Sequence, residues 1–219
     1  GSMQKVKTPL EYTVSAIRAL RSSTNGTFLP NSYSADTDGY DLIKTITNSG
    51  VILDSTLNRM GAMSLFDRAA PDGYAEDANY WISAGTLAER IRFVQSFSIA
   101  VGQAGHTGTM VTSTNDAGNN TYCLPYNLMV AKLSLASRTN AAAVVDYMLG
   151  IIFPGEGAGN LDQYRTAAIN FLNDGSADAP ASATQFASLT PGGGATSAYD
   201  IRVRGMIGYL LSLQRFQEQ

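Results

Sequence analysis

The chain has 219 residues, enough to bury one full hydrophobic core, and 44% of them are apolar. Its net charge is −3 at pH 7 and its basic residues are scattered, which excludes the dense positive patch typical of nucleic-acid binding. Only 15% of the residues are charged, against roughly 25% in an average soluble domain. This balance favours a periplasmic or extracellular setting.

Three further features bound the organisation of the chain. No stretch approaches 18 consecutive apolar residues, so we expect no transmembrane segment. Cys123 is the only cysteine, which excludes an internal disulfide. Residues 1–3 read Gly-Ser-Met, the pattern of an expression scar, and no repeat or charged linker divides the remainder. We therefore predict a single helical domain over residues 4–219.

The first predicted helix begins with a clear cap. Thr8 is a suitable N-cap, Pro9 suits the first helical position, and Glu11 completes a capping box. Apolar residues then follow at helical spacing: Leu10, Val14, Ile17 and Leu20. Two short helices are predicted over residues 40–48 and 51–60. Residues 71–74, Pro-Asp-Gly-Tyr, predict a tight turn.

The second half of the chain continues the helical pattern. Ser83 is predicted to cap a helix whose apolar residues share one face: Leu87, Ile91, Val94, Phe97 and Val101. Residues 102–120 indicate a long polar loop or a small hairpin. Further helices are predicted over residues 126–136, 140–149 with Gly150 as the stop, 161–172 and 200–217.

Glycines within the last predicted helix suggest close packing. Gly205 and Gly208 each cost about 1 kcal/mol relative to alanine inside a helix, so a neighbouring backbone is expected to approach them closely. No convincing run of alternating strands is present. The expected fold is all-α, an irregular bundle of six to eight helices with long polar loops.

Sequence signatures along the chain resemble an uncharacterised bacterial family, domain of unknown function 1800. The residues that carry the resemblance are 7–12 (Lys-Thr-Pro-Leu-Glu-Tyr) with Val14, Ser15 and Arg18; Gly61, Leu65, Phe66 and residues 71–74; Trp81, Ser83, Gly85 and Arg90; and residues 204–217. Members are usually about twice as long, so the resemblance implies that this is the C-terminal half of a larger protein. It also implies an envelope or secreted setting, often beside a gene of a second uncharacterised family, and no assigned reaction.

A first candidate site lies on the first predicted helix. Glu11, Ser15 and Arg18 are spaced by four and three residues and so share one face. A Glu–Arg pair there could hold a substrate carboxylate or polarise a group. The alternative is structural, with Glu11 closing the capping box and Arg18 docking on a neighbouring acid; it is favoured because most such pairs serve caps or ion pairs.

A second candidate site combines carboxylates and aromatic rings over residues 72–81. Asp72, Glu76 and Asp77 alternate with Tyr74, Tyr80 and Trp81, a combination that suits a sugar or small polar ligand, and two acids at the correct separation could hydrolyse a glycoside. In that hypothesis, a hydrolase or glycan-binding protein would use Arg18 or Arg90 to hold an anion. The favoured alternative is a turn at residues 71–74 and a core anchor at Trp81.

Asp36, Asp38 and Asp41 resemble a partial calcium loop. The acid expected at the twelfth position is Thr47, so an ordinary acidic turn is favoured, and no cofactor is expected, with calcium as the alternative. His106 is the only histidine and cannot build a multi-histidine metal site. Residues 155–160 are glycine-rich but lack the Lys-Ser/Thr of a phosphate loop.

No segment carries a complete catalytic motif, and whether the protein is an enzyme stays open. The leading hypothesis is a helical module of an exported bacterial protein that acts through protein–protein or envelope contacts. A protein partner is therefore expected.

Overall fold

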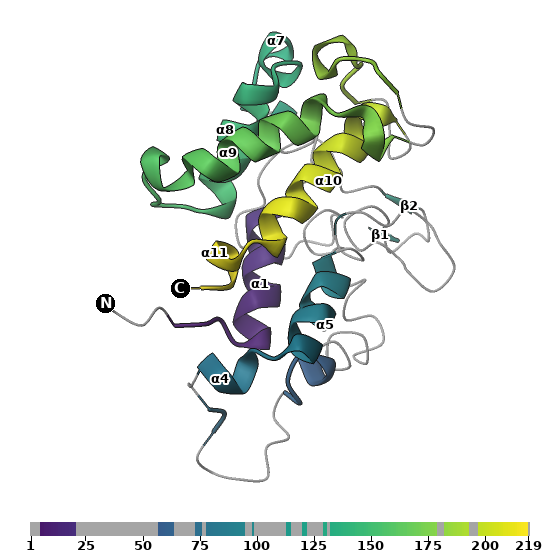
Figure 1. Cartoon of the computed structure of the whole chain (residues 1–219). Helices are drawn as coiled ribbons and strands as arrows, with labels where there is room; N and C mark the ends of the chain where they lie inside the picture. Colours follow the sequence, from purple (N-terminus) through teal and green to yellow (C-terminus); the bar gives the residue numbers. More distant parts are fainter. Residues whose placement is uncertain are drawn as a thin grey trace.

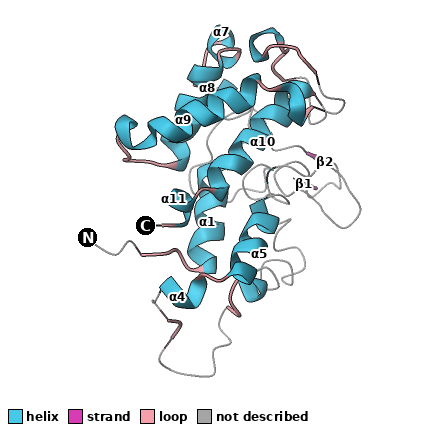
Figure 2. Ribbon diagram, in the orientation of Figure 1, coloured by secondary structure: helices cyan, strands magenta, loops and turns pink. Residues whose placement is uncertain are grey.

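The computed structural model describes residues 5–20, 57–63, 73–75, 78–94, 98, 113–114, 120–121, 129–130, 132–178, 182–192 and 197–218. Within these ranges eight α-helices have both of their ends: α1 (Pro9–Leu20), α4 (Ala78–Trp81), α5 (Ala84–Val94), α7 (Leu135–Arg138), α8 (Ala141–Ile152), α9 (Ala158–Asn173), α10 (Ala198–Ser212) and α11 (Gln214–Gln217). Figures 1 and 2 show that helices dominate. The predicted all-α fold is confirmed.

A small hairpin and two tight turns complete the described elements. The strands β1 (Ser113–Thr114) and β2 (Asn120–Thr121) pair antiparallel, so the hairpin alternative for this region is confirmed for these four residues. Two 3-10 turns, η2 (Gly175–Ala177) and η3 (Phe186–Ser188), lie between α9 and α10. No helix of the described chain combines the length and hydrophobicity needed to cross a membrane.

The core is built around α10, which contacts α5, α8 and α9 (Figure 1). α8 packs on α9, and α1 packs on α8. The side chains at the centre of these contacts are apolar and fully buried: Val144, Val145 and Met148 from α8, Ala168 and Leu172 from α9, and Val203, Met206, Ile207 and Leu210 from α10. The burial of these faces stabilises the arrangement through the hydrophobic effect.

The capping box of α1 is confirmed. The Thr8 backbone N–H donates to Glu11 Oε2 at 2.8 Å, and the Glu11 N–H donates to Thr8 Oγ1 at 3.3 Å. These two bonds satisfy donors that the first turn of a helix leaves without partners.

The buried face of α1 differs from the predicted one. Tyr12, Ala16 and Leu20 are buried, whereas Leu10 and Val14 are only half-buried. Aromatic packing explains the difference, because the Tyr12 ring meets Phe93 and Phe216 edge-on at centroid distances of 6.1 and 5.5 Å. The Tyr12 ring thus supplies buried apolar surface that the spacing of the aliphatic residues had predicted for Leu10 and Val14.

Two predicted helix boundaries are wrong. Gly150 does not stop α8, which continues to Ile152, because Ile152 is itself buried and the Phe153 N–H still donates to the Leu149 carbonyl at 2.9 Å. The helix predicted over residues 126–136 is interrupted, because Ser134 caps a new helix, α7. The Asn140 side chain accepts from the Ala143 N–H and so caps the start of α8.

The last predicted helix is also divided. α10 ends at Ser212, Leu213 adopts an extended conformation with φ −63° and ψ 143°, and α11 follows. Inside α10, a Cβ on Gly205 would lie 2.8 Å from Cζ of Phe171 on α9. The glycine therefore makes room for an aromatic ring, where the sequence predicted a neighbouring backbone.

Two predicted short helices lie wholly or partly outside the described residues. Residues 40–48 are not described. Of residues 51–60, only 57–60 are described, and residues 57–59 are helical.

Candidate functional site

The two ends of the described chain meet and pair. The Lys7 backbone N–H donates to the Gln217 carbonyl at 2.7 Å, and Val6 pairs with Glu218 in an isolated antiparallel bridge. The Lys7 ammonium donates to the Phe216 carbonyl at 2.6 Å and lies 4.1 Å from the centre of the Phe216 ring. The residues that carry the two terminal signatures are therefore parts of one structure, here called the terminal junction.

Arg90 on α5 connects the two terminal segments of this junction. Its side chain is fully buried; Nη2 donates to the Lys7 carbonyl at 2.7 Å and Nη1 to Gln217 Oε1 at 3.3 Å. The guanidinium carbon lies 4.9 Å from the centre of the Tyr12 ring, and the Tyr12 hydroxyl donates to the Leu211 carbonyl at 3.0 Å. Arg90 thus joins α1, α5 and both terminal segments.

The terminal junction brings a half-buried cation, Lys7, close to a fully buried one, Arg90. In the part of the chain that the structure describes, Arg90 contacts carbonyl and amide oxygens and an aromatic face, but no carboxylate. The pKa of Lys7 is lowered to about 8 because burial of the amine outweighs the opposing effect of Glu11, and the nearby charge of Arg90 acts in the same direction as burial. Burial likewise lowers the pKa of Arg90 and raises that of Tyr12.

The buried arginine also fixes which face of α5 is turned outward. The sequence predicts one shared apolar face for Leu87, Ile91 and Val94. Val94 is buried beside Arg90, but Leu87 is only half-buried and 44% of Ile91 is exposed. Because the bonds of Arg90 hold its own side of α5 against the junction, the Leu87–Ile91 stripe faces out.

This stripe forms one wall of an open groove of about 600 Å³, here called the α5 groove. In the part of the chain that the structure describes, the lining residues are Val6, Ile82, Leu87, Ile91, Ser212, Gln214, Gln217 and Glu218. The apolar side of the groove comes from α5, from Ile82 between α4 and α5, and from the N-terminal segment, and its polar side comes from the end of α10 and from α11. Such a surface can bury apolar side chains of a ligand while its rim supplies hydrogen bonds.

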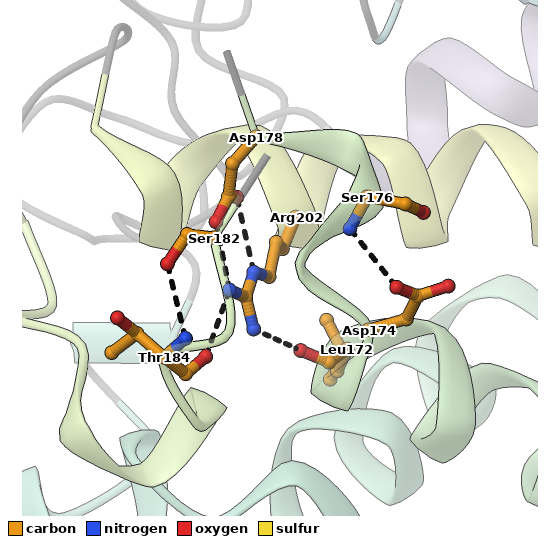
Figure 3. A network of polar contacts seen from close by, with 7 residues as sticks. All are labelled: Leu172, Asp174, Ser176, Asp178, Ser182, Thr184 and Arg202. Atoms are coloured by element: carbon orange, nitrogen blue, oxygen red, sulfur yellow. Dashed lines mark hydrogen bonds and ion pairs between the residues drawn. The ribbon is translucent and has the colours of Figure 1, made fainter. Parts of the chain in front are cut away.

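A second buried arginine, Arg202, organises the other end of the core (Figure 3). Its Nε and Nη2 donate to the two carboxylate oxygens of Asp178 at 3.0 and 2.7 Å. Nη1 donates to the Leu172 carbonyl at 3.0 Å and Nη2 also to the Thr184 carbonyl at 2.9 Å. Since Leu172 lies in the last turn of α9, the arginine satisfies a carbonyl that the helix leaves without a partner. This network holds Leu172, Asp178 and Thr184 against α10.

Among the described residues, neither Glu11 nor Arg18 lines the α5 groove. Glu11 is occupied by the capping box, and Lys5 Nζ lies 3.6 Å from its Oε1. Arg18 is exposed near the end of α1. A substrate role for either residue stays a prediction.

In the second candidate region, Trp81 is fully buried. Its indole N–H donates to the Ala75 carbonyl at 2.6 Å, and its ring packs against Tyr80 and Tyr74 at centroid distances of 4.8 and 6.0 Å. The indole atom Cε3 also lies 2.8 Å from the position of a Cβ on Gly61, so the close approach requires glycine there. The ring is enclosed by protein in this conformation.

The carboxylates of that hypothesis, Asp72, Glu76 and Asp77, lie outside the described residues, so its glycoside chemistry stays a prediction. Gly73, in the predicted turn, has φ +75°, the left-handed region that favours glycine.

The calcium hypothesis is likewise untested. Asp36, Asp38, Asp41 and His106 lie outside the described residues, and those that are described contain no cluster of three or more His, Cys, Asp or Glu side chains. In the glycine-rich stretch 155–160, Glu156 accepts a hydrogen bond from Arg215 Nε at 2.9 Å.

Sequence motifs do not identify several residues of the terminal junction and the α5 groove. Lys7 and Gln217 lie within the terminal signatures, but nothing local shows that they pair across the chain. The available signal is chemical: Arg90 lies three positions after Leu87 and four before Val94, a spacing at which an amphipathic helix normally places an apolar residue. Arg202 gives a similar signal inside the apolar α10.

Comparisons with known proteins give one finding. A family model described as protein of unknown function (DUF1800) matches residues 1–217, which is nearly the whole chain. Searches of curated proteins and of solved structures returned no match.

Proposed function

We propose a role in protein interaction for this chain, which belongs to the DUF1800 family of proteins of unknown function. In this proposal the chain is a module of an exported bacterial protein, and the α5 groove binds an amphipathic helix of a partner protein. The low proportion of charged residues, 15%, supports an extracytoplasmic setting.

The observation that carries the proposal is the outward orientation of Leu87 and Ile91. These residues are four positions apart and lie side by side on a helix surface. Ile91 is 44% exposed, which is unusual for a large apolar side chain in a chain of this length. It lines the groove together with Leu87, Ile82 and Val6. A second helix with apolar residues at positions i, i+3 and i+7 would pack its ridge into such a groove.

The polar side of the groove supports the same occupant. Ser212, Gln214 and Gln217 offer hydroxyl and amide groups along the rim, while Ile82, Leu87 and Ile91 supply the apolar wall. An apolar centre with a polar rim is the common pattern of specific protein interfaces.

Site-specific photocrosslinking in the native host tests the proposal. A photoreactive amino acid replaces Ile91 in one sample and, as a control, Leu135 in another; Leu135 is a 62% exposed apolar residue of α7, away from the groove. We expect a discrete protein crosslinked from position 91 and not from position 135.

The crosslinked partner is then purified and its affinity measured. Ile91→Asp should weaken binding at least tenfold, because the interface would bury an unpaired carboxylate, and Leu135→Asp should leave the dissociation constant unchanged. Equal binding by the two variants, or equal crosslinking from the two positions, would rule out the groove as the binding site.

A further inference from the structure

A second groove lies between α8 and α9, two helices that pack on one another (Figure 1). It has a volume of about 580 Å³, is here called the α8–α9 groove, and shares no lining residue with the α5 groove. Its floor is apolar, because Leu149, Phe153 and Leu161 line it, and each is at most 6% exposed. The floor is therefore part of the core, and the residues around it determine which ligand the groove accepts.

Two glycines that line this groove are not required by the packing of the described chain. Gly150 lies inside α8 and Gly159 in the first turn of α9, and a Cβ on either would have nothing within 4 Å. Neither has the positive φ that favours glycine. Since glycine destabilises a helix relative to alanine, alanine would suit the fold better at both positions. The glycines instead expose backbone that another chain can approach closely.

The rim of the groove on α8 and α9 has an excess of negative charge. Nε and Nη2 of Arg165 donate to the two carboxylate oxygens of Asp146 at 2.6 and 3.0 Å. Asp162 is exposed and acts electrostatically on the same guanidinium. One arginine thus faces two carboxylates, and this side of the rim attracts a cation.

The other end of the groove repeats this pattern. Glu156 lines the groove and accepts a hydrogen bond from Arg215 Nε at 2.9 Å. Arg215 also lies 3.7 Å from a carboxylate oxygen of Glu218. Here, too, a single guanidinium is shared by two carboxylates, so neither end of the groove presents an uncompensated positive charge.

We propose that the α8–α9 groove binds a basic segment of another protein, with the stem of a lysine or arginine over Phe153 and Leu161 and its charged head beside Asp162. Both side chains match the groove, because their long stems are apolar and their heads are cationic. Gly150 and Gly159 let the backbone that carries this side chain lie against α8 and α9. The site is separate from the α5 groove, and its test does not depend on the function proposed there.

Amide NMR titration with synthetic peptides tests this proposal. The probe is a capped Lys-Leu-Lys-Leu-Lys peptide, the charge control is Glu-Leu-Glu-Leu-Glu, and butylamine represents a free amine. We expect the basic peptide to shift the amide signals of Gly150 and Gly159 but not that of Gly85 on α5, with an affinity that falls as salt is added. The acidic peptide should shift neither glycine, and butylamine should bind at least about tenfold more weakly than the basic peptide because it makes no backbone contact.

Four variants locate the binding site. Gly150→Ala combined with Gly159→Ala should bind the basic peptide about tenfold more weakly, because two methyl groups narrow the groove. This variant should unfold at a temperature no lower than that of the wild type. Asp162→Asn should weaken binding about threefold, whereas Arg165→Gln should strengthen it because the competing cation is removed. Glu89→Gln removes a carboxylate from α5, outside the groove, and should leave the affinity unchanged.

Three results would overturn the proposal. The first is the absence of any shift at Gly150 and Gly159 with the basic peptide at millimolar concentration. The second is binding of the acidic peptide or of butylamine as tight as that of the basic peptide. The third is wild-type affinity in the double alanine variant, or a lower unfolding temperature of that variant, which would show that the two glycines serve the fold.

Discussion

Two of the arginines buried in the described part of the chain, Arg90 and Arg202, satisfy their charges in opposite ways. Arg202 has a carboxylate partner: both oxygens of Asp178 accept from it, and two carbonyls complete its shell. Arg90 has a carbonyl, an amide oxygen and an aromatic face. The first arrangement locks a loop onto the core, whereas the second leaves an uncompensated positive charge beside a groove. The difference indicates where the fold is fixed and where it can change.

The largest effect should come from breaking the Arg202 network. Arg202→Leu leaves the carboxylate of Asp178 buried without a partner, so the free energy of unfolding should fall by about 3–5 kcal/mol. Urea unfolding followed by circular dichroism measures the loss. The double variant Arg202→Met with Asp178→Leu should recover much of it, because no buried charge remains.

Arg165→Leu is the matched control, since Arg165 also pairs with an aspartate, Asp146, but on the surface. Its stability should be almost unchanged because water screens exposed pairs. A loss in Arg165→Leu as large as that in Arg202→Leu would contradict the interpretation that burial makes the network important.

A smaller loss is expected at the terminal junction. Arg90→Met leaves neutral acceptors at Lys7 and Gln217 without a donor, so the free energy of unfolding should fall by about 2–3 kcal/mol, less than for Arg202→Leu. Arg92→Met, on the exposed side of the same helix, should have little effect. If Arg90→Met destabilises more than Arg202→Leu, the contrast between the two arginines is wrong.

Packing should also differ between the tight and open parts of the C-terminal helices. Gly205→Ala places a methyl group against Phe171, whereas Gly150 in α8 has nothing within 4 Å of a Cβ position. Gly150→Ala should therefore stabilise the protein by about 0.5–1 kcal/mol through helix propensity. Gly205→Ala should be worse than Gly150→Ala by about 1–2 kcal/mol.

Thermal unfolding of both glycine variants measures this difference. The addition of Phe171→Leu to Gly205→Ala should recover part of the loss, because the smaller side chain removes the clash. If both alanine substitutions stabilise the protein equally, the contact between α9 and α10 accommodates the added methyl group at position 205, and the predicted clash is wrong.

The smallest expected effect is the pH dependence contributed by Lys7. Its pKa is about 8 in the folded protein and 10.5 when unfolded, so the unfolded state binds more protons between these values. The free energy of unfolding should therefore rise with pH from 8 to 10.5, by about 1 kcal/mol after allowance for solvent screening of a partly exposed amine. Urea titrations of the wild type minus those of Lys7→Met isolate this contribution. A difference that falls over this range would contradict the assigned burial of the amine.

Features that depend on neighbouring residues, such as helix caps, can be predicted from the sequence, whereas contacts between residues far apart in the chain cannot. The capping box at Thr8 and Glu11 depends on residues three positions apart and is confirmed. Gly150 predicts a helix end because glycine is common just after a helix, but burial of Ile152 outweighs the cost of one glycine inside α8.

The same limit applies to the candidate site. The spacing of Leu87 and Ile91 identified an apolar stripe, but the side of α5 that faces the core depends on Arg90 and on its partners Lys7 and Gln217, which lie at opposite ends of the chain. The spacing of apolar residues within α5 alone therefore cannot show which side of the helix faces the core. The glycoside and calcium hypotheses depend on carboxylates that lie outside the described residues, and they stay predictions.

The pairing of Lys7 with Phe216 also has a consequence for folding kinetics. The two residues are 209 positions apart, so the loop that closes when they meet is very long, and its entropic cost must be met before the contact forms. During synthesis, the Lys7 carbonyl is available to Arg90 early, but the Tyr12 hydroxyl and the Nη1 group of Arg90 lack their acceptors until the segment that carries Leu211 and Gln217 has left the ribosome. The terminal junction can therefore be completed only after that segment has emerged.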